Sequence, residues 1–533
     1  MKHLFTFLLL VFSSVMFSQE DAWVYFKDKP GAQSYFDTPS KMLSVRALDR
    51  RASQNIALDI TDVPVEKSYV NQVKLSTGIT IMAHSKWLNA LHIRGTQANI
   101  LLLKSLSFVE KVVFADKTLN TTLKKVSENK LSQTSDKLKT TIDYAYGSSA
   151  NQIQMLNGQA LHQQNFTGTG KIIAVLDAGF PGVNTAPPFK KLIDNHQILG
   201  GYDFVNRNEN FYTGDNHGTM VLSTMGGYQE NALVGTAPDA SYYLFITEDD
   251  PTENPVEESY WVEAAEKADS LGVDIITTSL GYFGFDNPNY SHTYNDMNSS
   301  TNFISRGAEI AFSKGIIVLA SAGNEGTTAE PHIGSPADAV SVITVGAVTA
   351  SKIKSGFSSI GPSFDGRIKP DVMAQGSLSV VSDTSGNIGA ANGTSFSCPI
   401  MAGMVACLWQ AFPSKTNKEI RQMILQSSDR YASPDNNYGY GIPNFGSTLG
   451  VENFQSSSSL FSVYPNPAQT TISFLFDNSA ASVSIYTVLG QKVIEKNITS
   501  QNPVLSVENL KSGLYFYNFD ADGVHKTGKI IKQ

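Results

Sequence analysis

The chain has 533 residues, of which 41% are hydrophobic, and a formal net charge of −8. This length exceeds one ordinary domain, and the hydrophobic content is ample for more than one core. The acidic balance, without any long block of lysine or arginine, argues against nucleic acid or an anionic membrane surface as a partner.

Residues 1–18 have the features of a secretory signal peptide. Lys2 supplies a positive start, residues 4–17 form a largely apolar stretch, and Ser18 is a small residue before the polar sequence QED. The apolar stretch is too short to span a bilayer comfortably, and the polar residues after it make a membrane anchor the weaker alternative. We therefore expect a mature chain without a transmembrane segment.

Residues 19–140 separate this signal from the first strongly buried strand. Alternating patterns at 22–26 and 73–82 and the apolar run at 109–114 predict strands, whereas the periodicity of 87–104 predicts a helix. Residues 117–139 are rich in Lys and Ser and poor in aromatics, which is typical of an exposed linker. The sequence therefore predicts a small α+β unit that ends near Asp116 and a linker after it.

Five buried runs then predict the strands of a mainly parallel sheet. They lie at residues 172–176, 242–246, 275–279, 316–320 and 342–345. Helix-like stretches such as 256–271 alternate with them, and this alternation is typical of a three-layer α/β domain.

The most informative motif is GTSFSCP at residues 393–399, in which Ser395 precedes a stretch that is apolar nearly all round. We expect a buried helix here, with Pro399 in its first turn. A serine at a helix start lies where backbone N–H groups and the helix dipole favour developing negative charge, as a nucleophile requires. Serine is also a common N-cap, so this motif alone leaves both interpretations open.

Three further residues favour the nucleophile. Asp177 ends the strand at 172–176, at the edge where open α/β sheets keep their sites, although an Asp there can simply begin a turn. His217 opens a stretch of small residues, and its ordinary pKa suits a general base. Asn324 follows the strand at 316–320, and its amide could donate a hydrogen bond to an oxyanion.

The order Asp177, His217, Ser395, with Asn324 before the serine, resembles the subtilisin-like serine proteases over roughly residues 145–450. The resemblance implies that Asp177 orients and charge-stabilises the imidazole of His217. It implies that His217 acts as general base and then acid, and that Ser395 attacks the scissile carbonyl. Asn324 and the backbone N–H of Ser395 would hold the oxyanion.

The resemblance also implies a substrate-binding region. Its residues would be Ser279, Leu280 and Gly281 on an edge strand, Ser321 to Gly323 on the opposite pocket wall, and Gly334 on the pocket floor. A glycine floor would leave room for a large apolar side chain. Two other positions depart from the commonest pattern of the family, because Met220 replaces a second His and Phe396 replaces the usual Met after the nucleophile. Neither position carries essential chemistry.

No cofactor is required for this chemistry. The family often carries structural calcium, but no ligand set can be assigned, because residues 249–250 and 286–287 are better interpreted as solvated loops. The only cysteines, Cys398 and Cys407, stand nine positions apart on one predicted helix, which separates them by roughly 13 Å. That is too far for a disulfide, so we expect small buried hydrophobes.

The last part of the chain changes character after the Ser-rich residues 453–460. Short alternating segments at 483–486, 490–493 and 513–517 predict a β-sandwich of about 70 residues. Its opening YPNP and its Gly-Leu-Tyr strand resemble the carboxy-terminal sorting domain of the type IX secretion system. That resemblance implies export from a bacterium of the Bacteroidetes kind, with the secretion machinery as a partner. A sugar-binding or adhesive module is the alternative.

The sequence thus predicts five parts. They are a signal peptide (1–18), an inhibitory and folding-assisting propeptide (19–140), a subtilisin-like peptidase domain (141–452), a linker (453–460) and a sorting β-sandwich (461–533). The predicted function is that of a secreted or cell-surface serine endopeptidase acting on proteins or peptides. The alternatives are an inactive binding scaffold and a surface adhesin, and the 19–140 unit could instead be a permanent accessory domain.

Overall fold

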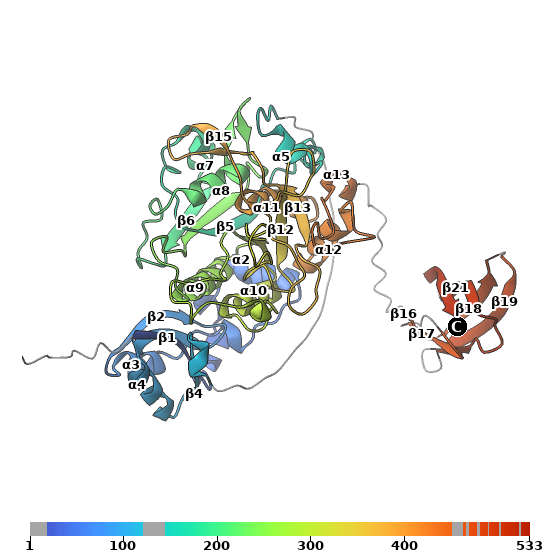
Figure 1. The fold of residues 1–533 in the computed structure, drawn as a ribbon, viewed down its shortest axis with the longest axis horizontal. Coiled ribbons are helices and arrows are strands. Elements are labelled where there is room, and N and C mark those ends of the chain that lie inside the picture. Colours follow the sequence, from blue (N-terminus) through green and yellow to red (C-terminus); the bar gives the residue numbers. More distant parts are fainter. Residues whose placement is uncertain are drawn as a thin grey trace, which may run out of the picture. The chain divides into compact units, whose positions relative to one another are not determined.

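The structure is a computed structural model. It describes residues 19–120, 144–449 and 462–533, the last with gaps at 465–467, 477–479, 489, 500–502 and 522–523. The predicted signal peptide, the predicted linker 453–460 and residues 121–139 of the first predicted linker lie outside the described residues. The chain divides into two compact units, residues 1–450 and 451–533, and each is described by itself (Figure 1).

The first unit begins with a four-stranded antiparallel sheet in the order β2-β3-β1-β4. Its strands are β1 (Gln19–Phe26), β2 (Ile79–Ser85), β3 (Ala90–Thr96) and β4 (Val109–Phe114), and helices α3 (Lys67–Lys74) and α4 (Gln97–Leu102) accompany it. One face of this sheet has a core of its own, which includes Val24, Leu91 and Ile93. The other face joins Trp23 and Tyr25 to a core that also contains Trp261 of the next domain.

The helix predicted over 87–104 is wrong in its first part, because Ala90–Thr96 is the strand β3, and only the second part is helical, as α4 (Gln97–Leu102) and a 3-10 turn (Leu103–Ser105). The strand predicted over 73–82 is displaced too, since Val73 ends up in α3 and β2 starts at Ile79. In β3 the apolar Leu91 and Ile93 alternate with the polar His92 and Arg94, and residues 90–93 are nonetheless all buried because both faces of the sheet are covered.

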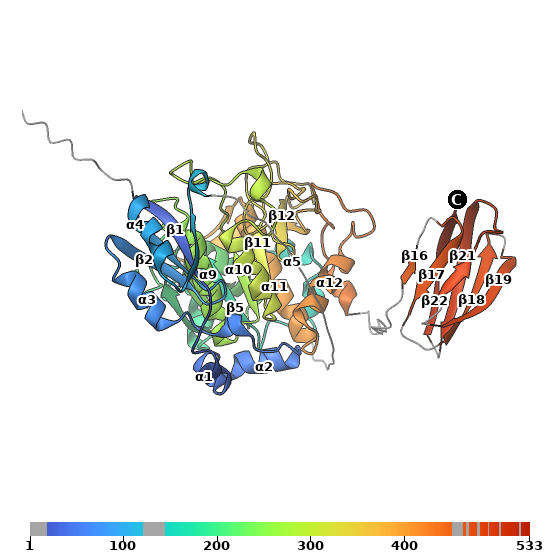
Figure 2. The same ribbon diagram turned by 90° about the horizontal axis from the view of Figure 1, so that it is seen from below.

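Between β1 and α3 the chain forms the short helices α1 (Gln33–Phe36) and α2 (Val45–Ser53), at the lower margin of Figure 2. Two 3-10 turns, Pro39–Lys41 and Ile60–Asp62, lie beside them in the chain. Met42, Leu43, Ala47 and Val63 pack into a small core separate from that of the sheet.

The second domain is built on a seven-stranded parallel sheet in the order β13-β12-β11-β10-β5-β9-β6. The strands are β5 (Ile172–Asp177), β6 (Ile198–Asp203), β9 (Ser241–Ile246), β10 (Ile275–Thr278), β11 (Ile317–Ser321), β12 (Ile343–Val348) and β13 (Val372–Gln375). The five predicted strands are confirmed. β6 and β13 were not predicted, and they form the two edges of the sheet.

Helices cover both faces of this sheet, with α8 (His217–Gly226) and α11 (Thr394–Ala411) on one side and α9 (Val256–Leu271) and α10 (Phe303–Ser313) on the other (Figure 1). Successive residues of each strand pack into the hydrophobic cores on opposite faces of the sheet. Ile173 and Val175 of β5 belong to the core with α8 and α11, whereas Ala174 and Leu176 belong to the core with α9 and α10. Burial on both faces explains the continuous apolar runs.

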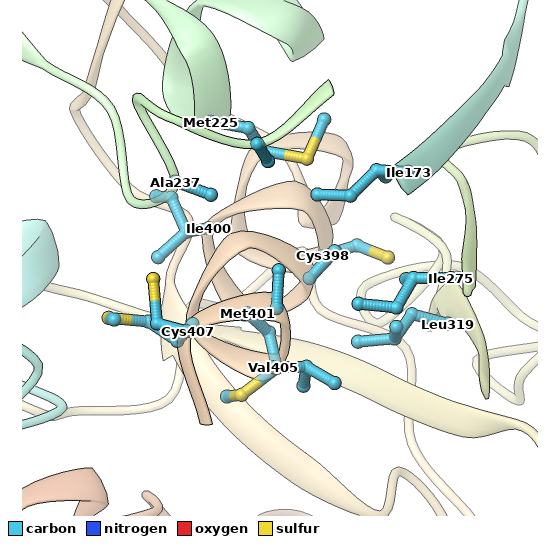
Figure 3. Close-up of a cluster of buried hydrophobic side chains, with 14 of the residues drawn as sticks. Ile173, Met225, Ala237, Ile275, Leu319, Cys398, Ile400, Met401, Val405 and Cys407 are labelled. Atoms are coloured by element: carbon cyan, nitrogen blue, oxygen red, sulfur yellow. The ribbon is translucent and has the colours of Figure 1, made fainter. Parts of the chain in front are cut away.

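Helix α11 crosses the middle of its layer and is buried along nearly its whole length. Met401 and Val405 lie on the side of α11 that faces Ile275 and Leu319 of the sheet, whereas Ile400 lies beside Ala237 (Figure 3). Because α11 begins at Thr394, Pro399 lies inside the helix and not in its first turn, which corrects the prediction. Cys398 and Cys407 are buried free thiols, as expected.

Smaller elements complete the domain. They are α5 (Ala150–Gln154), α6 (Gln159–His162), α7 (Lys190–Asp194), α12 (Asn417–Ser427), α13 (Phe445–Thr448) and the strand pairs β7 (Tyr228–Gln229) with β8 (Leu233–Val234) and β14 (Ser379–Ser382) with β15 (Ile388–Ala391). No helix in the described part of the chain is both long and apolar enough to cross a membrane.

The second unit consists of strands in two sheets, ordered β16-β17-β20 and β19-β18-β21-β22. Its strands are β16 (Ser462–Tyr464), β17 (Thr471–Leu475), β18 (Ala480–Thr487), β19 (Lys492–Thr499), β20 (Val504–Ser506), β21 (Gly513–Ala521) and β22 (Val524–Lys532). In β21, Tyr515, Tyr517 and Phe519 face inward and alternate with exposed residues. This period of two is the pattern of a strand with one face packed on the core and the other exposed to solvent.

Candidate active site

The site lies at the carboxyl edge of the parallel sheet, where β5 ends at Asp177. Asp177 is fully buried, and its Oδ1 accepts hydrogen bonds from the Nδ1 of His217 at 2.7 Å and from the N–H of Ala178 at 2.9 Å. Its Oδ2 is buried without a partner among the described residues. The carboxylate therefore fixes the imidazole with Nδ1 protonated, which leaves Nε2 available as a base.

His217 is the first residue of α8, and its N–H donates to Oδ1 of Asp215 at 2.8 Å. The helix approaches β5 closely because residue 218 is glycine. A Cβ on Gly218 would lie 2.4 Å from the carbonyl oxygen of Gly179 and 3.0 Å from the Cβ of Asp177. The small residue after the histidine is thus what allows the imidazole to reach the carboxylate.

Ser395 is the second residue of α11 and is 8% exposed. Its Oγ donates to the carbonyl oxygen of Ser279 at 3.5 Å, and the Oγ of Ser279 donates to the carbonyl oxygen of Ser395 at 2.8 Å. Among the described residues, no hydrogen bond joins Ser395 to His217. The ring of Phe396 lies 6.1 Å from the imidazole, centroid to centroid, so the nucleophile turn and the histidine are close neighbours. Such a bond commonly tightens only when substrate is present.

Asn324 follows β11 and faces the start of α11. Its Oδ1 accepts hydrogen bonds from the N–H of Thr394 at 2.9 Å and from the Oγ1 of Thr394 at 3.0 Å. These two donors fix the orientation of the amide, since only a carbonyl oxygen can accept both. The NH₂ group is therefore the part of this exposed side chain that remains free to donate.

The predicted pocket residues lie in two segments that follow neighbouring strands of the sheet. Ser279, Leu280 and Gly281 follow β10, and Ser321 to Gly323 follow the paired strand β11. Residues 279–281 are not part of a sheet strand, but Tyr282 and Ser335 bond to each other through both backbone N–H groups, at 2.8 and 3.2 Å. A Cβ on Gly334 would lie 3.3 Å from the carbonyl oxygen of Tyr282, so this position is tight for any larger residue.

A cavity of about 370 Å³ adjoins the same edge of the sheet, lined among others by Ala178, Asp215 and Glu248. The Oε2 of Glu248 accepts a hydrogen bond from the hydroxyl of Tyr282 at 2.8 Å. Burial raises the pKa of Glu248 to about 8. Burial by itself would lower the pKa of His217, but the charge and hydrogen bond of Asp177 outweigh it and raise that pKa to about 9.

In the described part of the chain, one group of three carboxylates is close enough together to hold a metal ion: Glu248, Glu253 and Glu257. Both oxygens of Glu257 already accept backbone N–H groups, from Asp249 at 2.9 Å and Asn254 at 3.0 Å. Burial raises the pKa of Glu257 to about 9, which favours its protonated form at neutral pH. Hydrogen bonds thus engage one oxygen of Glu248 and both oxygens of Glu257.

Comparison with known proteins agrees with this geometry. The family model described as the Subtilase family matches residues 168–441. This chain belongs to the subtilase family. Subtilisin NAT of Bacillus subtilis subsp. natto is 32% identical to this subtilase over 295 residues, which cover 55% of this chain and 69% of that protein. A subtilisin of Bacillus pumilus is 31% identical and is covered to 95%, again over 55% of this chain. Serine protease AprX of Bacillus subtilis (strain 168) is 30% identical, with 54% and 67% covered.

Two further family models match the flanking regions of this subtilase. Residues 21–134 match the Peptidase S8 propeptide domain of Bacteroidota, and residues 462–533 match the secretion system C-terminal sorting domain. The protein is thus an exported serine peptidase made with a propeptide and a sorting domain.

Thr394, Tyr282 and Glu248 take part in the site and were not predicted. Thr394 stands within the GTS motif, so its proximity to the serine was a usable signal. Tyr282 and Glu248 are 34 residues apart, and nothing in their local sequences indicates that they meet.

Proposed function

We propose that this subtilase is an endopeptidase that cleaves peptide bonds through Asp177, His217 and Ser395. The observation that carries the proposal is the 2.7 Å hydrogen bond between His217 and a fully buried Asp177, at the edge of the sheet where Asn324 follows β11 and Ser395 lies in the first turn of α11. A buried carboxylate that orients an imidazole beside a serine is the arrangement of nucleophilic acyl transfer.

In this mechanism the Oγ of Ser395 bonds to the scissile carbonyl carbon while its proton passes to Nε2 of His217. The oxyanion accepts hydrogen bonds from the NH₂ of Asn324 and the N–H of Ser395. The C–N bond then breaks, and His217 gives the proton to the leaving amine. A water molecule, deprotonated by His217, hydrolyses the acyl-enzyme and regenerates Ser395. We propose that residues 19–120 and the chain after them keep this machinery inactive until they are cut from it.

Labelling with a fluorophosphonate serine-hydrolase probe tests the mechanism. The wild-type protein, with its propeptide removed, should carry the label on Ser395, and Ser395→Ala should remove it. Ser397→Ala is the matched control, because the Oγ of Ser397 is buried and donates to the carbonyl oxygen of Thr394 at 3.0 Å. A folded, processed wild-type protein without label would contradict the proposal and favour a binding scaffold.

The choice of peptide substrate distinguishes endopeptidase from exopeptidase activity. Peptides blocked at both ends should be cut internally at the same rate as unblocked ones. Deletion of residues 461–533 should leave this activity unchanged, because the sorting unit has its own core. An adhesin would instead lose its binding on that deletion.

A further inference from the structure

The segment of residues 44–62, here called the anchor segment, contacts the catalytic domain at the edge of the sheet opposite to the active site. Helix α9 ends at Leu271 before β10 starts at Ile275, and α10 ends at Ser313 before β11 starts at Ile317. In a parallel sheet these positions lie at the amino edge, whereas Asp177 ends β5 at the carboxyl edge. The anchor segment binds the carboxyl ends of α9 and α10.

Arg50 and Arg51 of the anchor segment reach a buried carboxylate in the last turns of α9. The Nη2 of Arg51 donates to both oxygens of Asp269, at 2.9 and 2.8 Å, and Arg50 also pairs with this carboxylate. Arg50 further donates to the carbonyl oxygens of Val273 and Lys314, just after the two helices. Cations are favoured at helix carboxyl ends, so both arginines are placed where the helix dipoles stabilise them.

Charges of both signs lie on both sides of the interface between the anchor segment and the catalytic domain. The Nζ of Lys314, which caps α10, donates to Asp59 at 2.8 Å and to Asp62 at 3.2 Å. Asp62 also accepts from Arg51 at 2.9 Å. Among the described residues, every ion pair of Asp269 and of Lys314 is made with residues 19–120 and none within the catalytic domain.

These groups are removed from solvent. The side chains of Asp62 and Asp269 are fully buried, and those of Arg51 and Lys314 are each 2% exposed. Burial would raise the pKa of Asp269, yet Arg50, Arg51 and Lys86 hold it below its usual value. Close, buried charge pairs at a protein interface are strongly coupled, and removing one partner leaves the other unpaired.

We propose that the anchor segment, which is part of the propeptide, is a second contact that holds the propeptide on the catalytic domain after the chain between them has been cut. Its site on the catalytic domain, which includes Asp269 and Lys314, takes a helix with two adjacent guanidinium groups and a carboxylate from the turn that follows that helix. Because it lies at the amino edge of the sheet, it governs how long the propeptide stays bound and leaves the chemistry at Ser395 unchanged.

The test uses the full chain with Ser395→Ala and with residues 128–134 replaced by the recognition sequence of a foreign protease. The cut then needs no activity of this protein, so the result is independent of the proposed function. The cut protein is immobilised through its carboxyl end, and the release of the propeptide is timed. The wild-type fragment should stay bound, and Arg51→Ala should release it at least tenfold faster. Lys190→Ala, which breaks an exposed pair with Asp194, should not change the rate.

A double-mutant cycle between Arg51→Ala and Asp269→Ala should show a coupling of at least tenfold, about 1.4 kcal/mol. Circular dichroism of the uncut variants checks their folding, and Lys314→Met replaces any variant that fails to fold, with the same tenfold acceleration expected. Immediate release of the wild-type fragment, release of the folded variants at the wild-type rate, or additive effects in the cycle would each overturn the proposal.

Discussion

Replacement of Asn324 by Asp changes one atom group of the proposed oxyanion site and almost nothing else. The carboxylate has the shape of the amide, and one oxygen can still accept the two hydrogen bonds from Thr394 at 2.9 and 3.0 Å. The other oxygen takes the place of the NH₂ group, so the donor is lost and a negative charge faces the oxyanion. Asn324 is exposed, and we therefore expect no change in folding.

The expected loss has two parts. Removal of a side-chain oxyanion donor costs about 2.7–4 kcal/mol in subtilisin, and we carry that value over to this chain. Repulsion between two charges about 4 Å apart adds about 1 kcal/mol where water screens them. The sum, about 3.7–5 kcal/mol, predicts a fall in kcat of about 500- to 5,000-fold at one factor of ten per 1.36 kcal/mol.

Steady-state kinetics on a blocked peptide at pH 8 measure this loss, with Asn324→Ala as the comparison. The alanine variant loses the donor without gaining a charge, so its kcat should fall by only about 100- to 1,000-fold. KM should change little in either variant, because the oxyanion exists only in the transition state. If Asn324→Asp were within tenfold of the wild type, or milder than Asn324→Ala, the assigned orientation of the amide would be refuted.

Two further predictions concern pH and packing. Since the pKa of His217 is raised to about 9 and only the neutral imidazole is a base, kcat/KM should rise with pH and level off above about 9. Glu248 contributes to this elevation, so Glu248→Gln should move the rise to lower pH, and a pH–rate profile with its rise near 6.5 in both proteins would contradict the assignment. Gly403→Ala would place a Cβ 2.0 Å from the Oγ1 of Thr236, and we expect it to lower the free energy of unfolding by about 1–3 kcal/mol. Urea unfolding measures this change, and an unaltered midpoint would mean that α11 can shift.

The central strands and α9 could be predicted because their burial follows simple patterns. β5 and β11 are apolar up to their last residues, Asp177 and Ser321, and apolar residues recur every three or four positions in 256–271. β3 was missed although Leu91, His92, Ile93 and Arg94 alternate between apolar and polar, because Trp87, Leu88 and Leu91 also stand at helical spacing. The polar face of β3 is buried, and its His92 contacts Ser259 of the catalytic domain. Local sequence does not show that a second domain will cover a sheet.

The candidate catalytic residues were found because each stands in a short motif at the end of a strand or the start of a helix. The structure brings Asp177 and His217 together, and it places Asn324 against the residue before Ser395. The contact between Tyr282 and Glu248 depends on two loops that leave different strands. Such contacts follow from the fold as a whole, so no local pattern predicts them.

The outward side of α9 carries a polar stripe that Ser259, Glu263, Glu266 and Asp269 form at helical spacing. In this structure each of the four bonds to residues 19–120, and all are buried. An apolar stripe would bind the propeptide too. Once the propeptide dissociated, however, that stripe would be an exposed apolar patch on an exported enzyme, and such patches promote aggregation. Carboxylates can exchange their protein partners for water. The same helix face can therefore pack against the propeptide in the precursor and face water once the propeptide has left.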